Sequence, residues 1–217
     1  MGGKGRKNFL PLLGRPVLAH TIAAFELSRH ISSIIIAVPP GDEALCLKEI
    51  VEKYGFKKVA AIVAGGNERQ RSVLNALKAV KGRLDIIAVH DGARPLVTAA
   101  VIERTIAEAA KTGAAICAVR VKDTIKEARS GLVIKTVPRD GLWAVQTPQA
   151  FSYATLKDAF EKAGQDNFIG TDESSLVERL GVEVSVVEGS YENIKITTPE
   201  DLVTAECILK SRTRVRD

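Results

Sequence analysis

The segment His90-Asp91-Gly92-Ala93-Arg94-Pro95 places an acid and an arginine directly after an apolar run. We expect Leu84–His90 to be a buried strand, so Asp91 would emerge at the carboxyl end of a sheet, where open α/β folds bind ligands. A carboxylate there can hold Mg²⁺ against substrate phosphates, and Arg94 can pair with a phosphate as a planar fork. The alternative is that Asp91 forms a turn and Arg94 is solvated, but the position in the topology favours a ligand site.

A second candidate is Gly65-Gly66-Asn67-Glu68-Arg69-Gln70-Arg71-Ser72, at another predicted strand-to-helix junction. Two glycines permit a close approach to the backbone, and a helix N-terminus attracts an anion or the polar edge of a ligand. Gly-Gly-Asn is also an ordinary turn. The segment alone therefore leaves a ligand loop and a plain turn equally open.

Four further clusters carry more polar chemistry than connecting loops need: Asp123-Thr124, Pro138-Arg139-Asp140-Gly141-Leu142-Trp143, Gly170-Thr171-Asp172-Glu173 and Asn193-Ile194-Lys195-Ile196-Thr197. Thr171 is either a ligand contact, a helix N-cap, or both. Lys195 lies in a predicted short strand and points away from its apolar neighbours, so it faces either solvent or a cleft.

These candidates are held by elements that alternate between strand and helix. We expect strands at 34–38, 59–64, 84–90, 114–121, 184–187 and 194–196, and helices at 42–54, 68–80, 98–111, 153–163, 172–180 and 198–210. This alternation is typical of a Rossmann-like, doubly wound α/β fold with a mostly parallel sheet. The alternation of strands and helices is interrupted at 123–137, where the sequence predicts a β-hairpin arm. An arm exposes strand edges, so we expect a second copy of the chain to cover it.

Composition points to small anionic partners. The 217 residues carry a formal charge of +5 and a sequence pI near 9.1, whereas aromatic residues make up only 5%, too few for a nucleic-acid stacking surface. The apolar runs are short, so we expect no membrane span. Three scattered cysteines favour neither a disulfide framework nor a zinc site. We expect a single cytoplasmic domain over 1–217.

The motifs together resemble one family. FLPLLGRPVLAHT, GGNERQRSV, VHDGARP, VKDTIK, PRDGLWAVQTPQAF, GTDESSLVE and ENIKITTPEDL occur in the order typical of the 2-C-methyl-D-erythritol 4-phosphate cytidylyltransferases, over essentially the whole chain. The related ribitol 5-phosphate cytidylyltransferases share much of this pattern, and a non-catalytic nucleotide-binding relative is a further alternative. The resemblance implies a GT-A-like nucleotidyltransferase domain, a homodimer, and transfer of the cytidylyl group of CTP to a polyol phosphate with Mg²⁺.

The resemblance also implies roles for individual residues. Its catalytic residues are Lys7, Asp91 and Lys195, with Asp91 also serving the metal. Around CTP it places Gly65, Gly66, Asn67, Ser72, Asp91 and Gly92, although Asn67 replaces an acid often found there. Around the polyol phosphate it places Arg94, Thr124, Arg139, Thr171 and Lys195, with Thr147 in a supporting position and Arg139 reaching the partner subunit's substrate.

The family pattern begins with a strand and a glycine-rich loop that end just before the Met-Gly at which this sequence starts. A fragment or misassigned start would explain this, and so would a shortened, inactive relative; the retained site residues favour the first. We expect the chain as printed to be less stable than an intact relative and to show little or no turnover.

Overall fold

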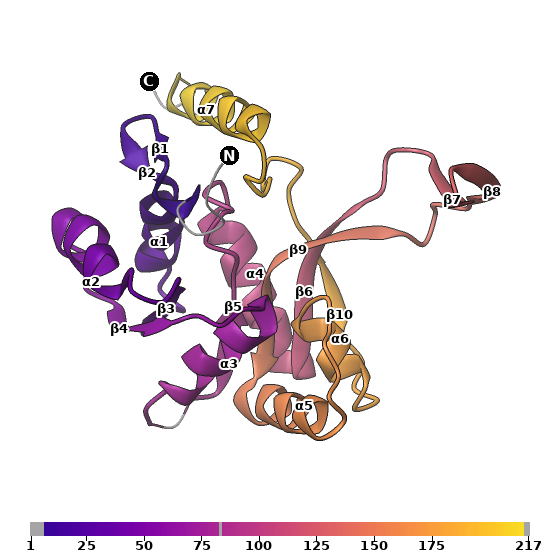
Figure 1. Ribbon diagram of the computed structural model, residues 1–217, viewed down its shortest axis with the longest axis horizontal. Coiled ribbons are helices and arrows are strands. Elements are labelled where there is room, and N and C mark those ends of the chain that lie inside the picture. Colours follow the sequence, from indigo (N-terminus) through magenta and orange to yellow (C-terminus); the bar gives the residue numbers. More distant parts are fainter. Residues whose placement is uncertain (1–6, 83, 215–217) are drawn as a thin grey trace.

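The computed structural model describes residues 7–82 and 84–214, which form an α/β fold around a mixed four-stranded sheet (Figure 1). The order of strands across this sheet is β10 (Ser185–Glu188), β6 (Ala114–Arg120), β9 (Trp143–Ser152) and β5 (Ile86–Val89). Strand β10 runs parallel to β6, whereas β9 is antiparallel to both β6 and β5. The α/β class is thus confirmed, with one long antiparallel strand at the centre.

Helices cover both faces of this sheet. Phe151 of β9 packs against α5 (Tyr153–Gln165) and α6 (Glu173–Glu178), while its neighbour Ala150 faces α4 (Ala99–Thr112). This alternation follows from the two-residue period of a strand, which sends successive side chains to opposite faces. The Thr98 hydroxyl caps α4 by accepting a hydrogen bond from Val101 N.

A second, separate ladder pairs β3 (Ile34–Val38) in parallel with β4 (Val59–Ala64). In the described part of the chain, no hydrogen-bonded ladder joins β3 to β5. Between these two strands lies a cavity of about 360 Å³, lined also by α1 (Val17–Leu27) and α3 (Arg69–Lys78). We call it the β3–β5 slot.

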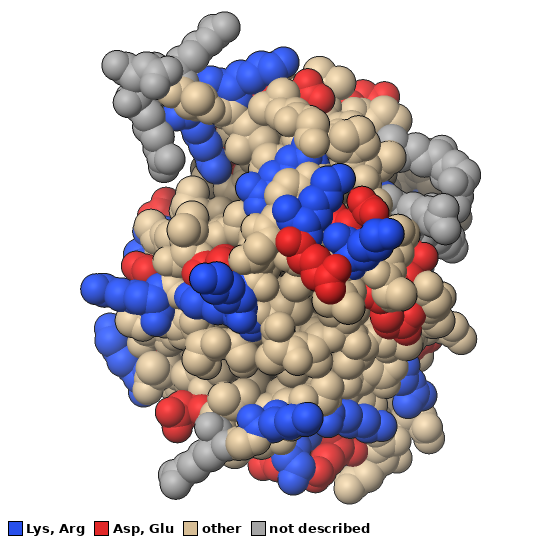
Figure 2. All heavy atoms as spheres, turned by 90° about the vertical axis from the view of Figure 1, so that its left-hand side faces the viewer, with Lys and Arg blue, Asp and Glu red and all other residues tan. Residues whose placement is uncertain are grey.

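The remaining elements flank these two ladders. They are the 3₁₀ turn Lys7–Phe9, β1 (Pro11–Leu12), β2 (Arg15–Pro16), α2 (Glu43–Cys46), the π-helical turn Leu47–Glu52 and α7 (Pro199–Arg214). None of the helices in the described ranges is long and apolar enough to cross a membrane. On the face that carries α2, lysine and arginine side chains are interspersed with acidic ones and with broad uncharged areas (Figure 2).

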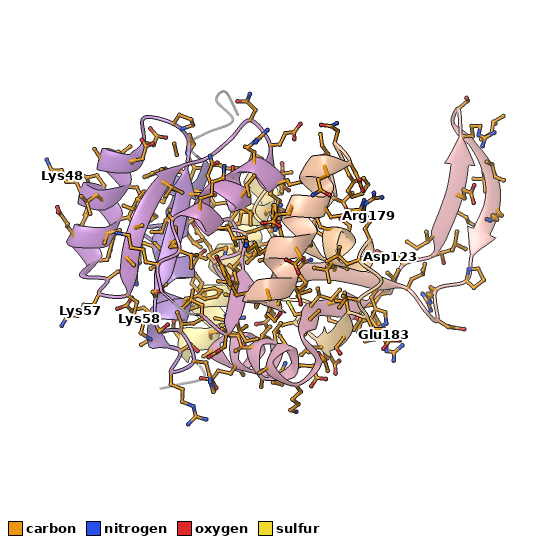
Figure 3. The ribbon with its side chains drawn as sticks, turned by 90° about the horizontal axis from the view of Figure 1, so that it is seen from below. Lys48, Lys57, Lys58, Asp123, Arg179 and Glu183 are labelled. Atoms are coloured by element: carbon orange, nitrogen blue, oxygen red, sulfur yellow. The ribbon has the colours of Figure 1, made fainter. Side chains whose placement is uncertain are left out.

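The predicted arm is present as a hairpin of β7 (Ile125–Arg129) and β8 (Leu132–Val137). It stands out from the body on two extended segments, with Asp123 at its root, while Lys48, Lys57 and Lys58 lie at the opposite end of the molecule (Figure 3). The turn places Ser130 and Gly131 at positive φ. Exposed apolar side chains follow along β8: Leu132, Val133 and Ile134.

Two expectations about strands were wrong. Strand β9, which holds the four-stranded sheet together, was not predicted at all. The strand expected at 194–196 does not form; this segment is an irregular connection whose Ile196 N donates to Ala93 O at 2.8 Å. One backbone bond to the Asp91 loop, rather than a ladder, therefore aligns it.

Candidate functional site

The centre of the site is the Asp91 carboxylate, which is surrounded by three cations. Arg69 Nε lies 2.9 Å from Oδ1, Lys195 Nζ lies 2.9 Å from Oδ2, and Arg94 Nε lies 3.7 Å from Oδ2. Burial alone would raise the pKa of Asp91, but Arg69 and Lys195 hold the pKa of this carboxyl well below its usual range. Asp91 is therefore an anion at neutral pH, in a setting with excess positive charge.

Asp91 is positioned by the end of β5 and by the middle of the antiparallel strand β9. It follows β5, and its backbone N–H donates to Thr147 Oγ1 of β9 at 3.0 Å. The same hydroxyl lies 3.0 Å from His90 Nδ1. Burial lowers the pKa of His90 to about 4, so the imidazole is neutral at physiological pH. Thr147 thus contacts both Asp91 and His90.

The Lys195 side chain points toward Asp91 and is partly exposed. Lys195 lies two positions after Asn193, whose fully buried side chain donates to Gln146 Oε1 at 3.2 Å and to Thr147 O at 2.9 Å. Arg94 Nη1 in turn donates to Asn193 O at 2.8 Å. The Lys195 side chain remains 38% exposed, so its ammonium can meet a ligand while it contacts Asp91.

The Gly65–Ser72 segment forms a compact turn at the end of β4 and the start of α3. Gly65 N donates to Val38 O at 2.6 Å, and Gly66 N donates to Ser72 Oγ at 3.0 Å. A β-carbon at Gly66 would collide with the Arg71 side chain, so this position requires glycine. Ser72 lines the same cavity as Asp91 and Gly92, whereas Asn67 is exposed.

One pair of charged residues at the site was missed by the sequence reasoning. Arg69 Nη1 lies 2.7 Å from both carboxylate oxygens of Glu173, which is only 1% exposed. Burial raises the pKa of Glu173, and the positive charge of Arg69 only partly opposes this rise. Burial alone would lower the pKa of Arg69, but the negative charges of Glu173 and Asp91 raise it. Both residues stood inside quoted motifs, but nothing in their spacing predicted the contact.

Four predicted residues lie outside this cluster. Lys7, Thr124, Arg139 and Thr171 are exposed, and in the described ranges no hydrogen bond or ion pair joins their side chains to Asp91. Arg139 lies at the arm root, where its guanidinium donates to Lys122 O. The N-cap of α6 is Asp172, not Thr171, because Asp172 Oδ1 accepts from Ser175 N at 3.0 Å.

The protein groups around Asp91 do not by themselves make a metal cage. The described residues contain no group of three or more His, Cys, Asp or Glu side chains placed to hold a metal ion. Mg²⁺ is, however, commonly held by one or two carboxylates together with substrate phosphates and water. Asp91 keeps its charge and 14% of its side chain is exposed, but both of its oxygens contact protein cations, so a metal ion would have to arrive with a polyphosphate and displace one of these contacts.

Comparison with known proteins finds relatives over nearly the whole chain. A sequence model of the family "2-C-methyl-D-erythritol 4-phosphate cytidylyltransferase" matches residues 1–211. The relative of that name from Geotalea uraniireducens (strain Rf4) is 47% identical over 213 residues, which are 97% of this chain and 91% of that protein. The one from Syntrophotalea carbinolica is 50% identical over 210 residues, 96% of this chain and 90% of the relative.

The crystal structure of the enzyme of that name from Thermus thermophilus superposes with a TM-score of 0.80 at 36% identity, covering 94% of this chain and 93% of that one. For the 4-diphosphocytidyl-2C-methyl-D-erythritol synthase from Anaerococcus prevotii the TM-score is 0.84 at 34% identity, over 92% and 88% of the two chains. Fold and site define a nucleotidyltransferase of the α/β class. The chain belongs to the 2-C-methyl-D-erythritol 4-phosphate cytidylyltransferase family.

Proposed function

We propose that this protein transfers the cytidylyl group of CTP to 2-C-methyl-D-erythritol 4-phosphate, in the non-mevalonate route to isoprenoids. The observation that carries the proposal is the Asp91 carboxylate amid Arg69, Arg94 and Lys195, next to a glycine turn at the carboxyl ends of β4 and β5. Such a site suits two phosphorylated substrates that must meet, because their mutual repulsion needs cations at the point of contact.

In this reaction a phosphate oxygen of the polyol substrate forms a bond to the α-phosphorus of CTP. The bond from that phosphorus to the oxygen bridging it to the β-phosphate breaks, and pyrophosphate leaves with the electron pair. The protein's contribution is alignment and neutralisation of charge. We assign the cytidine side to Gly65, Gly66, Asn67, Ser72 and Gly92, and the polyol-phosphate side to Arg94, Thr124, Arg139, Thr171 and Lys195.

Lys195 is the best-placed catalytic cation, because its ammonium lies 2.9 Å from Asp91 and is still partly exposed. Lys7 completes the proposed catalytic set; it precedes Asn8, whose side chain lines the cavity beside Asp91 and Gly92. We assign Mg²⁺ to Asp91 together with the CTP phosphates. When bound, the ion would supply further positive charge to the triphosphate.

The proposal includes a homodimer formed through the 123–137 arm. Leu132, Val133 and Ile134 are 74%, 63% and 51% exposed, a run of apolar side chains that a second arm would bury. Thr124 and Arg139 at the arm root would then face the partner's substrate. Leu132→Lys should shift the mass in sedimentation equilibrium from dimer to monomer at micromolar concentration; a wild-type protein already monomeric there would contradict the dimer.

We further propose a cytoplasmic location, which the three free thiols support, because stable disulfides belong to oxidising compartments.

The function is tested by Mg²⁺-dependent release of pyrophosphate from CTP with either 2-C-methyl-D-erythritol 4-phosphate or ribitol 5-phosphate as acceptor. We expect any release to require the methylerythritol substrate and to fall at least about 100-fold in Lys195→Gln, while Lys210→Gln, a lysine of α7, serves as the matched control. Release with ribitol 5-phosphate alone would overturn the substrate assignment. Tight CTP binding without turnover, even at high enzyme concentration, would identify a non-catalytic relative.

A further inference from the structure

A buried ion pair connects three segments that face the proposed ligands. The Arg69 guanidinium contacts Glu173 through Nη1 at 2.7 Å and Asp91 through Nε at 2.9 Å. Arg69 begins α3, Glu173 begins α6, and Asp91 follows β5. One side chain therefore joins the loop on the cytidine side to the central carboxylate and to the loop that contains Thr171.

The next residue of α3 strengthens this connection. Gln70 Oε1 accepts from Gly170 N at 2.9 Å, and Gln70 Nε2 donates to Phe168 O at 3.1 Å. The 168–170 segment is thus fixed to α3 by two hydrogen bonds, immediately before Thr171. Arg69 and Gln70 together hold the start of α3 against the start of α6.

The burial of Glu173 explains why this arrangement can set the position of Asp91. A carboxylate that is 1% exposed must keep a charged partner, so Glu173 confines the Arg69 guanidinium to one place. The planar fork then directs its Nε at Asp91 Oδ1, which leaves Oδ2 toward Lys195. A lysine could not make both contacts with the same geometry, because its ammonium is a single point of charge.

We propose that Arg69 and Glu173 are positioning residues for the cytidylyl transfer: Glu173 fixes Arg69, and Arg69 orients the Asp91 carboxylate between the two substrates. Neither residue needs to touch a reacting atom. This inference rests on the proposed function, and its effect should appear in kcat rather than in the affinity for CTP.

The kinetic test compares Arg69→Met, Arg69→Lys and Glu173→Gln with a control, Arg104→Met. Arg104 is an exposed arginine of α4 whose guanidinium donates to Glu188 O at 2.9 Å on the surface. We expect the first three to lower kcat about 10–100-fold, with little recovery in Arg69→Lys, and to change KM for CTP by less than about threefold. In an Asp91→Asn background, Arg69→Met should cause no further loss. Unchanged kcat in the single variants, or fully additive losses in the double variant, would overturn the inference.

A second measurement needs no turnover. In the ligand-free protein, amide hydrogen exchange over 89–94 and 168–173 should become faster in Arg69→Met and Glu173→Gln, but not in Arg104→Met. Unchanged exchange in both segments would refute the positioning role whatever the activity. Faster exchange in these variants, together with no pyrophosphate release from the unmodified chain, would support the positioning of Asp91 and show that the chain as printed lacks the proposed activity.

Discussion

Replacing Asn193 by leucine should weaken both the fold and the reaction. The Asn193 side chain is fully buried and donates to Gln146 Oε1 and Thr147 O, so it fastens the irregular 193–197 segment to β9. Lys195 is two residues further on, and Arg94 donates to the Asn193 carbonyl. Leucine has a similar volume but no hydrogen-bond donor, so the substitution removes both hydrogen bonds without leaving a large cavity.

The magnitude follows from the two acceptors that lose their donor. Each buried acceptor left unpaired costs about 1–3 kcal/mol. Gln146 Oε1 keeps a long contact with Ser190 N at 3.4 Å, and the Asn193 Oδ1 atom, which has no partner among the described residues, is removed as well. We therefore expect the free energy of unfolding to fall by about 2–4 kcal/mol and Tm by about 4–16 °C.

Urea unfolding and pyrophosphate release should be measured on the same preparations. Because an error of about 1 Å in a positioning group can cost about 100-fold, we expect a loss of that order in kcat/KM for the polyol phosphate. Thr105→Val is the control: Thr105 is equally buried, but its hydroxyl donates to Val101 O within α4, so only stability should fall, by about 1 kcal/mol. Normal kcat/KM in a destabilised Asn193→Leu protein would refute the link to Lys195.

Three other predictions concern thiols, core and metal. Burial raises the pKa of Cys46 to about 11 and of Cys117 to about 12, whereas Cys207 is exposed, so at pH 8 a thiol reagent should react rapidly with Cys207 and with the other two only after unfolding. Phe151→Ala should lower the free energy of unfolding by about 3–5 kcal/mol in a urea titration, because Phe151 is fully buried between β9 and helices α5 and α6; a loss below about 1 kcal/mol would contradict that packing. Chelation of divalent cations should abolish any pyrophosphate release yet leave Tm unchanged, since Asp91 is neutralised by protein cations when no ligand is bound; a marked fall in Tm would indicate a resident metal.

Local sequence signals predicted most of the elements but not the strand that joins them. The strands predicted at 34–38 and 114–121 and the helix predicted at 98–111 are confirmed by the structure. The sequence did not predict strand β9, because the segment Gln146-Thr147-Pro148-Gln149 is polar and contains a proline, a pattern that argues against a central strand. Tertiary contacts overcome this: Gln149, only 1% exposed, donates to Asp172 Oδ2 and accepts from Ser174 N.

For the site, the strand-end argument correctly placed Asp91, and Arg94 with it. It left open whether Lys195 faces solvent or a cleft, because the position of the 193–197 segment depends on the hydrogen bond from Ile196 N to Ala93 O and not on a strand. The Arg69–Glu173 contact was beyond such reasoning: the two residues are 104 positions apart, and no local period relates them. The roles of Thr124 and Arg139 remain predictions that depend on a second subunit.

In the described ranges, the β3–β5 slot lies between two hydrogen-bonded networks of strands. One network pairs β3 with β4 and leads into the glycine turn; the other contains β5 and leads into Asp91. The Arg69–Asp91 ion pair joins the two sides. A nucleotide that contacted both the glycine turn and Asp91 would hold the two networks together, so its binding would raise the free energy needed to separate them.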